Sequence, residues 1–144
     1  MSILLIDIGN SRLKWAMASS NGDLDSDFID QGSSMNDSPT QLAQFDPLSK
    51  NQSIEKIICS SVIGETQTLA LKKHLKTIMP QASWFQMNGL SAIEHLGSQY
   101  DQPEQLGADR RAMALGAHQM FPNKNLLVIS AGTATTIDLI TPSH

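Results

Sequence analysis

The sequence has little cysteine and no excess of basic residues. It contains a single cysteine, Cys59, so no disulfide can form within the chain. A lone cysteine inside an apolar run is typical of a buried thiol in a protein of the reducing cytoplasm. Lys and Arg number 10 against 14 Asp and Glu, which gives a formal net charge of −4. Because nucleic acids attract basic patches, and the Lys and Arg residues here are scattered, we expect no direct binding to DNA.

Long apolar runs and the common glycine-rich phosphate motifs are also missing. No apolar stretch reaches the length needed to span a membrane, and the first residues lack the charged region and cleavage site of a signal peptide. Neither G-x-G-x-x-G nor G-x-x-x-x-G-K-[ST] occurs, so the Rossmann and P-loop modes of phosphate binding are not supported. The sequence therefore predicts a cytoplasmic protein with no membrane partner, and 144 residues suffice for one domain with a real core.

Two segments of the chain share one outline, LLIDIGNS at 4–11 and LVISAGTA at 127–134. In each, an apolar run typical of a buried strand is followed by glycine and then by hydroxyl or amide side chains. Such a turn exposes backbone N–H groups that suit phosphate oxygens, so the repeat predicts a duplicated fold that binds a nucleotide. The alternative is two ordinary turns at the ends of core strands. Asp7 favours the first interpretation, because a carboxylate at the end of a central strand is costly to bury unless it is paired or serves a metal.

The hydrophobic pattern predicts an alternating α/β chain. Strands are expected at 4–8, 12–18, 27–31, 54–62, 82–87, 126–130 and 135–140, a loop at 33–39, and helices at 38–46, 64–79 and 109–121. This order is that of a ribonuclease-H-like mixed sheet flanked by helices. Three sets of residues are expected on inner faces: Leu13, Trp15 and Met17 on the second strand; Leu69, Leu71, Leu75 and Ile78 on the middle helix; and Ala112, Leu115 or Gly116, and Met120 on the last helix.

A third segment, from Tyr100 to Arg111, is predicted to be a loop that leads into the last helix. Its small residues at 107–108 would let a substrate pack against the backbone. Asp109 lies at the expected helix start, where a carboxylate caps N–H groups and is favoured by the helix dipole. The functional alternative makes Asp109 the base that orients an attacking hydroxyl in phosphoryl transfer. Arg110 would then direct positive charge toward substrate or phosphate, and otherwise it is simply solvated.

Taken together, three motifs resemble type III pantothenate kinase: Asp7-x-Gly9-Asn10-Ser11-x-x-Lys14, Tyr100-x-x-Pro103-x-x-Leu106-Gly107-x-Asp109-Arg110 and Gly132-Thr133-Ala134-Thr135-Thr136-x-Asp138. The resemblance implies an actin-like ATPase fold of the acetate-and-sugar-kinase superfamily. Residues 1–124 would form a first ribonuclease-H-like domain, and residues 125–144 would begin a duplicated second one. The chain would cover only roughly the first half to three-fifths of a family member, and alone we expect it to be inactive.

The function that the resemblance implies is ATP-dependent phosphorylation of pantothenate to 4′-phosphopantothenate, the first step of coenzyme A biosynthesis, by a homodimer. Two alternatives remain open. Some relatives of this family were described as accessory factors in transcriptional regulation, and another actin-like ATPase or sugar kinase would share the phosphate turns.

The resemblance also implies roles for individual residues. The first phosphate turn would comprise Asp7, which organises Mg²⁺ through water, with Ile8, Gly9, Asn10, Ser11, Arg12, Leu13 and Lys14. Thr133 would contact the ATP phosphates from the second turn. Pantothenate would bind to Tyr100, Gly107, Ala108, Asp109 and Arg110, with Asp109 as the proton acceptor. Ser130 stands where many members carry an aspartate that helps to hold a monovalent cation, so we expect a weak dependence on K⁺ or NH₄⁺.

Overall fold

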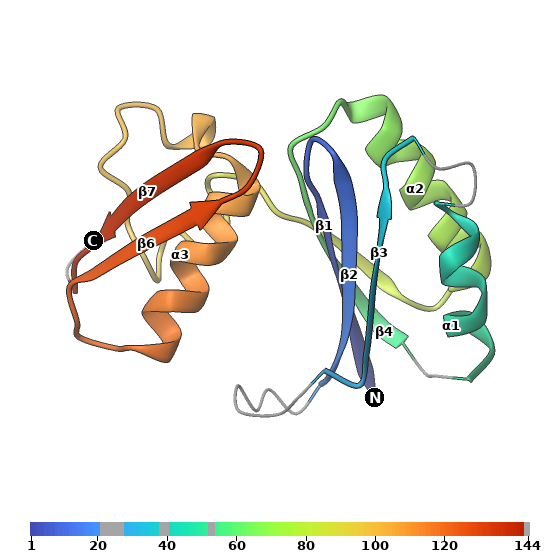
Figure 1. Ribbon diagram of the computed structural model, residues 1–144. Helices are drawn as coiled ribbons and strands as arrows, with labels where there is room; N and C mark the ends of the chain where they lie inside the picture. Colours follow the sequence, from blue (N-terminus) through green and yellow to red (C-terminus); the bar gives the residue numbers. More distant parts are fainter. Residues whose placement is uncertain (21–27, 38–40, 52–53, 143–144) are drawn as a thin grey trace. The chain divides into compact units, whose positions relative to one another are not determined.

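The computed structural model describes residues 1–20, 28–37, 41–51 and 54–142 (Figure 1). These residues form two compact units, Met1–Gln86 and Met87–His144, and each is described by itself. No helix formed by the described residues is long and apolar enough to cross a membrane. The expected boundary near residue 124 concerns a duplicated second domain, and it stays a prediction.

The first unit is a five-stranded mixed sheet with helices in its crossover connections (Figure 1). Its strands run in the spatial order β3-β2-β1-β4-β5. The pairs β1–β2 and β2–β3 are antiparallel, whereas β1–β4 and β4–β5 are parallel. This is the predicted ribonuclease-H-like sheet. Its elements are β1 (Ser2–Ile8), β2 (Arg12–Ser19), β3 (Asp30–Met35), η1 (Ala43–Phe45), α1 (Asp46–Asn51), β4 (Ile54–Ser61), α2 (Glu65–Ile78) and β5 (Ser83–Gln86).

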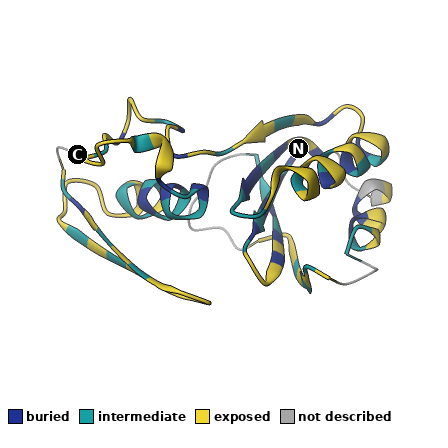
Figure 2. Cartoon of the chain, turned by 90° about the horizontal axis from the view of Figure 1, so that it is seen from above, coloured by how far each residue is buried: buried dark blue, intermediate teal, exposed yellow. Residues whose placement is uncertain are grey.

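The core of this unit lies between one face of the sheet and the helices. Register pairs Ile6 with Trp15 and Ile8 with Leu13, and all four side chains are buried on the same face. Phe45 and residues of α2 complete this cluster, so the helices cover that face (Figure 2). Burial of each large apolar side chain of this kind stabilises the folded state by about 1.5–3 kcal/mol. The predicted alternation of β2 is therefore confirmed, with the apolar side chains inside and the cationic ones outside.

Three expectations for the first unit were wrong in position. The third strand begins at Asp30 and extends to Met35, into the first part of the predicted loop, and residue 27 lies outside the described residues. A helical segment begins at Ala43, although one was expected from 38 to 46, and residues 38–40 are also outside the described part. Leu69 of α2 is 52 % exposed, whereas Leu71 and Leu75 are buried. The third strand is polar and lies at the edge of the sheet, so its pattern carries little hydrophobic signal.

The thiol of Cys59 should resist alkylation in the native protein. Cys59 lies in β4 and is fully buried, as predicted. Burial raises the pKa of this thiol from 9.0 to about 12, with a smaller contribution in the same direction from the Asp7 carboxylate and an opposing one from Gln86. Since the thiolate is the nucleophile, we expect mass spectrometry to find no iodoacetamide adduct at pH 8 until urea unfolds the chain. Equal rates with and without urea would contradict this placement.

The second unit packs a helix against a β-hairpin. Its elements are η2 (Pro103–Gln105), α3 (Ala108–Met120), β6 (Leu126–Ala131) and β7 (Thr135–Ile140). Ile140 and Ala114 are buried between hairpin and helix, with Val128 partly buried beside them. The other face of the hairpin exposes four large apolar side chains: Leu127, Ile129, Ile137 and Leu139.

The inner face of α3 is only partly the one expected. Leu115, one of the expected residues, packs against the apolar cluster of this unit. The buried residues, however, are Ala108, Arg111 and Ala114, whereas Met120 is 59 % exposed and Gly116 is exposed. The inner face was misplaced because a charged residue occupies its centre. Arg111 is only 1 % exposed, so it would be counted as polar in any hydrophobic pattern although it is part of the interior.

Candidate functional site

The first glycine turn joins β1 to β2. Ile8 pairs with Leu13, so residues 9–12 form the connection, and the N–H of Gly9 donates to the carbonyl of Arg12 at 2.9 Å. The side chains of Ile8 and Leu13 are buried, each 1 % exposed. These two residues can therefore serve a ligand only through their backbone. The residues between them are at the surface, where polar groups can meet a solvated phosphate.

Polar residues of three strands lie side by side on the face of the sheet opposite the core. Asp7 pairs with Lys14 on β2 and with Ser60 on β4. Ser60 is buried, and its hydroxyl has no hydrogen-bond partner among the residues that the structure describes. The Asp7 carboxylate and the Ser60 hydroxyl lie near the ends of two neighbouring central strands. They can contact a cation that is already bound to other ligands.

These oxygen ligands fit Mg²⁺ that is bound together with a nucleotide. No group of three or more His, Cys, Asp or Glu residues that could hold a metal ion occurs in the described ranges 1–20, 28–37, 41–51 and 54–142. Mg²⁺ does not need such a cluster, since it keeps several waters and is held by one or two carboxylates plus substrate phosphates. Asp7 is therefore suited to orient a metal that the nucleotide brings.

The second glycine turn has the outline of the first but is one residue shorter. Ala131 pairs with Thr135, so residues 132–134 form the connection between β6 and β7. The N–H of Gly132 donates to the carbonyl of Ala134 at 3.1 Å, and Thr133 lies exposed in the turn. The two segments thus share a strand–glycine–strand arrangement, with different loop lengths.

Ser130 lies on the hairpin face that is turned toward α3. It pairs with Thr136, whose hydroxyl is buried and has no hydrogen-bond partner within the described part of the chain. Asp138 follows two residues later on the same strand and hence on the same face. The position expected to hold a cation ligand is therefore lined by hydroxyl groups. The role of Ser130 stays a prediction.

Asp109 lies in the first turn of α3. The helix begins at Ala108 after Gly107, and one carboxylate oxygen of Asp109 accepts the N–H of Arg110 at 2.8 Å. Asp109 therefore satisfies one of the N–H groups that a helix start leaves without a partner within the helix. A Cβ at Gly107 would lie 2.6 Å from that oxygen, so the carboxylate can occupy this place because residue 107 is glycine.

Arg110 is held by two neighbours. Its Nε donates to Asp138 at 3.0 Å, its Nη2 donates to the other oxygen of the same carboxylate, and the guanidinium lies 5.7 Å from the ring centre of Tyr100. The hydrogen bond to Asp138 is the main reason that the pKa of Arg110 is raised. The structure thus brings the predicted residues Tyr100 and Arg110 together. Asp138, for which the sequence predicted no role, is the last residue of the motif that begins at Gly132. It lies on the same face of β7 as Thr136.

A cavity of about 190 Å³ lies beside this cluster, within the second unit. Tyr100 and Asp138 line it together with apolar side chains from the loop and from β7, including Leu96 and Ile140. Its wall is stabilised by Arg111, whose guanidinium donates to the carbonyls of Ser91, Ala92, Leu96 and Gly97 at 2.5–3.5 Å. Burial lowers the pKa of this guanidinium. Arg111 thus fixes the loop that leads into Tyr100.

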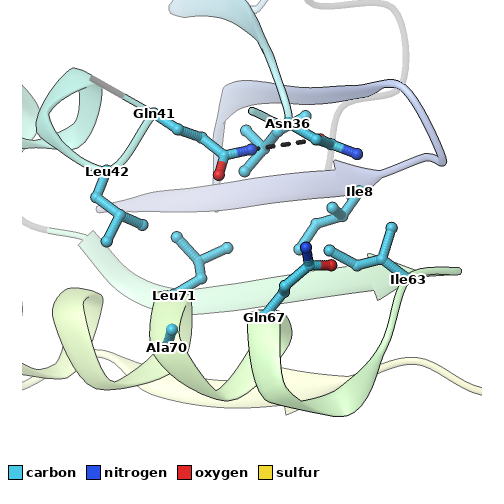
Figure 3. Close-up of a pocket in the computed structure, with 9 residues that line it drawn as sticks. Ile8, Asn36, Gln41, Leu42, Ile63, Gln67, Ala70 and Leu71 are labelled. Carbon is cyan, nitrogen blue, oxygen red and sulfur yellow. Dashed lines mark hydrogen bonds between the residues drawn. The ribbon is translucent and has the colours of Figure 1, made fainter. Parts of the chain in front are cut away.

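A second cavity, of about 120 Å³, lies beside the first glycine turn in the first unit (Figure 3). It is lined by Ile8, Leu13, residues of α2 and two amide side chains, Asn36 and Gln41. Asn36 contacts the turn directly and was missed from the sequence, because it belongs to none of the three motifs. The candidate residues thus form two groups, one in each unit: residues 7–14 in the first, and Tyr100, residues 107–110, Ser130 and Thr133 in the second.

Comparisons with known proteins extend over nearly all of the chain. The family model for type III pantothenate kinase matches residues 3–144. A type III pantothenate kinase of Herminiimonas arsenicoxydans is 35 % identical over 146 residues, covering 96 % of this chain and 53 % of the relative. One of Janthinobacterium sp. (strain Marseille) is 35 % identical over 147 residues, covering 96 % of this chain and 54 % of the relative.

Among solved structures, a Ppx/GppA phosphatase of Aquifex aeolicus matches with a TM-score of 0.49 and 11 % identity, over 100 % of this chain and 49 % of that one. The chain spans about half the length of the curated relatives it matches. With three motifs in order and a family match from residue 3 to residue 144, the chain belongs to the type III pantothenate kinase family.

Proposed function

We propose that the protein carrying this chain transfers the γ-phosphoryl group of ATP to pantothenate and so forms 4′-phosphopantothenate. The observation that carries the proposal is the cluster of Tyr100, Arg110 and Asp138 beside a cavity, next to the helix start that bears Asp109. An actin-like ATPase or sugar kinase needs only the phosphate turns, so this cluster favours pantothenate as the acceptor. The acidic charge argues only against direct binding to DNA within the alternative of an accessory factor in transcriptional regulation.

The first turn would bind the phosphates of ATP. Backbone N–H groups of residues 10–12 would donate to phosphate oxygens, and Lys14 would add a point charge. Thr133 would donate from the second turn. Bound Mg²⁺ would neutralise charge on the phosphates, and Asp7 would hold its waters in place.

Asp109 would accept the proton of the attacking hydroxyl. As a carboxylate, Asp109 is a weak base. Phosphoryl transfer passes through a loose transition state in which positioning and charge neutralisation matter most, so a weak base suffices. Its hydrogen bond to the Arg110 N–H would fix the carboxylate for this task.

Arg110 would bind the carboxylate of pantothenate. Asp138 engages the Nε and Nη2 side of the guanidinium, and Tyr100 lies against its face, so the group is pre-oriented for a planar carboxylate. The backbone at Gly107 and Ala108 would let the substrate approach closely. We also infer that the protein works as a homodimer in the cytoplasm, and light scattering of the purified protein tests the dimer.

An acceptor screen tests the proposal. The family-length protein, meaning a polypeptide of the relatives' full length that includes this chain, would be assayed for ADP release with pantothenate, with a panel of sugars and with no acceptor. Release that depends on pantothenate supports the proposal. Release that depends on a sugar, or that needs no acceptor, supports another actin-like ATPase, and no release with any acceptor supports the regulatory alternative.

We expect the family-length protein to depend on K⁺ or NH₄⁺ more weakly than relatives that carry aspartate at the position of Ser130. A serine hydroxyl adds no negative charge, so it binds K⁺ less well than a carboxylate. Ser130→Asp should therefore increase K⁺ activation severalfold. Initial rates in Na⁺, K⁺ and Tris buffers of matched ionic strength measure this. Strong K⁺ activation of the unmodified protein, unchanged by the substitution, would show that residue 130 does not set the cation site.

A further inference from the structure

Asn36 contacts three consecutive carbonyl groups of the first glycine turn. Its side-chain Nδ2 donates to the carbonyl of Gly9 at 2.7 Å and to that of Asn10 at 2.9 Å. Its backbone N–H donates to the carbonyl of Ser11 at 3.1 Å. Asn36, the residue directly after β3, thus donates to the carbonyl of every peptide unit between Gly9 and Arg12.

These contacts determine which way the N–H groups of the turn point. The described residues contain no cis peptide bond, and in a trans peptide the C=O and the following N–H point in opposite directions. Because the carbonyls of residues 9–11 point toward Asn36, the N–H groups of Asn10, Ser11 and Arg12 point away from it. Successive N–H groups on one side of a turn form a concave site for an anion.

We propose that Asn36 is a positioning residue for nucleotide binding, which holds the first turn with its N–H groups directed at the ATP phosphates. The inference rests on the proposed function of this turn and adds a residue outside the family's motifs. Asn36 need not touch the nucleotide itself. It acts by binding the carbonyls on the opposite side of the same peptide units.

A chain of hydrogen bonds links Asn36 to the core of the first unit. Gln41 Nε2 donates to Oδ1 of Asn36 at 3.3 Å, which leaves Nδ2 facing the turn (Figure 3). Gln44 in turn donates to the carbonyl of Gln41 at 2.5 Å and accepts from the indole N–H of Trp15 at 2.9 Å. Trp15 is itself part of the buried cluster. The amide of Asn36 is therefore held in one orientation by groups that extend from the core.

Two substitutions test the proposal in the family-length protein. Asn36→Asp keeps the shape of the side chain but replaces the donor Nδ2 with an oxygen that repels the two carbonyls. Asn36→Ala removes the side chain and leaves the carbonyls to water, so it provides a second variant if the first folds poorly. Asn88→Asp is the matched control, because Asn88 is an exposed loop residue whose Oδ1 accepts the N–H of Leu90, a role that aspartate retains.

The readouts are the Kd of Mg·ATP from calorimetry, the KM for each substrate, kcat and the melting temperature. We expect both Asn36 variants to weaken ATP binding at least about tenfold, the loss of roughly one hydrogen bond to a charged group. The KM for pantothenate should stay within about twofold, as expected for substitutions without shared partners, and Asn88→Asp should match the unmodified protein. A merely structural role would lower the melting temperature without this selective change in ATP binding.

The outcomes separate this inference from the proposed function. If the unmodified protein phosphorylates pantothenate and both Asn36 variants bind ATP normally, the inference is overturned and the function stands. If the unmodified protein binds ATP but does not phosphorylate pantothenate, and the variants bind ATP more weakly, the inference stands and the function fails. If the unmodified protein does not bind ATP at all, both are overturned.

Discussion

Asp109→Asn is expected to lower the rate of phosphoryl transfer by about 10²–10⁴-fold, the usual contribution of general acid–base catalysis. The amide oxygen of asparagine can still accept the N–H of Arg110, a bond of 2.8 Å in the structure, so the start of α3 should persist. The amide cannot take the proton of the attacking hydroxyl. The Kd of Mg·ATP should therefore change little while kcat collapses.

Asp101→Asn is the matched control, since Asp101 is an exposed carboxylate of the same loop and should tolerate the change. Steady-state rates with saturating ATP and pantothenate, together with calorimetric ATP binding, provide the comparison. If Asp109→Asn retains more than about a third of the original rate, far above the loss expected for a base, Asp109 serves only the helix start.

Arg111→Met is expected to destabilise the protein by about 3–5 kcal/mol, because each carbonyl left buried without a donor costs about 1–3 kcal/mol. Arg111 is 1 % exposed and donates to four carbonyls of the loop at 91–97. Methionine fills much of the volume but leaves those carbonyls buried without donors. Because this loop leads into Tyr100 and lines the cavity, binding of pantothenate should weaken as well.

Denaturant unfolding of Arg111→Met and Arg111→Lys measures this effect, with Lys124→Met as a control that removes an exposed cation from the same unit. Lysine cannot reach four carbonyls with its single ammonium group, so Arg111→Lys should recover little of the loss. A loss of less than about 1 kcal/mol in Arg111→Met, as for an ordinary surface substitution, would mean that the loop is held by other contacts.

The parts of the fold that the sequence predicted well are those with a strong apolar pattern. The run that forms β1 and the alternation of Leu13, Trp15 and Met17 in β2 placed the centre of the sheet correctly. The helix α2 was also found, and it ends at Ile78, shortly before Pro80 as expected. In these elements local periodicity and tertiary burial agree, so the sequence alone was sufficient.

The parts that the sequence missed depend on contacts between distant residues. Arg111 is buried because carbonyls of a loop up to 20 positions away accept its hydrogen bonds, and no local pattern contains that information. Asn36 binds a turn that is 27 positions earlier, and Asp138 binds Arg110 from 28 positions later. The motifs identified the two glycine turns and the loop that leads into α3, but they did not identify the residues that hold these segments in place.

Product analysis of one reaction tests the central claim most directly. The family-length protein would be incubated with Mg·ATP and pantothenate, and phosphorus NMR with mass spectrometry would identify the products. The account predicts one ADP for each phosphate monoester formed on the primary hydroxyl of pantothenate, and almost none of either with Asp109→Asn. ADP without phosphorylated pantothenate, or equal product from both proteins, would contradict it.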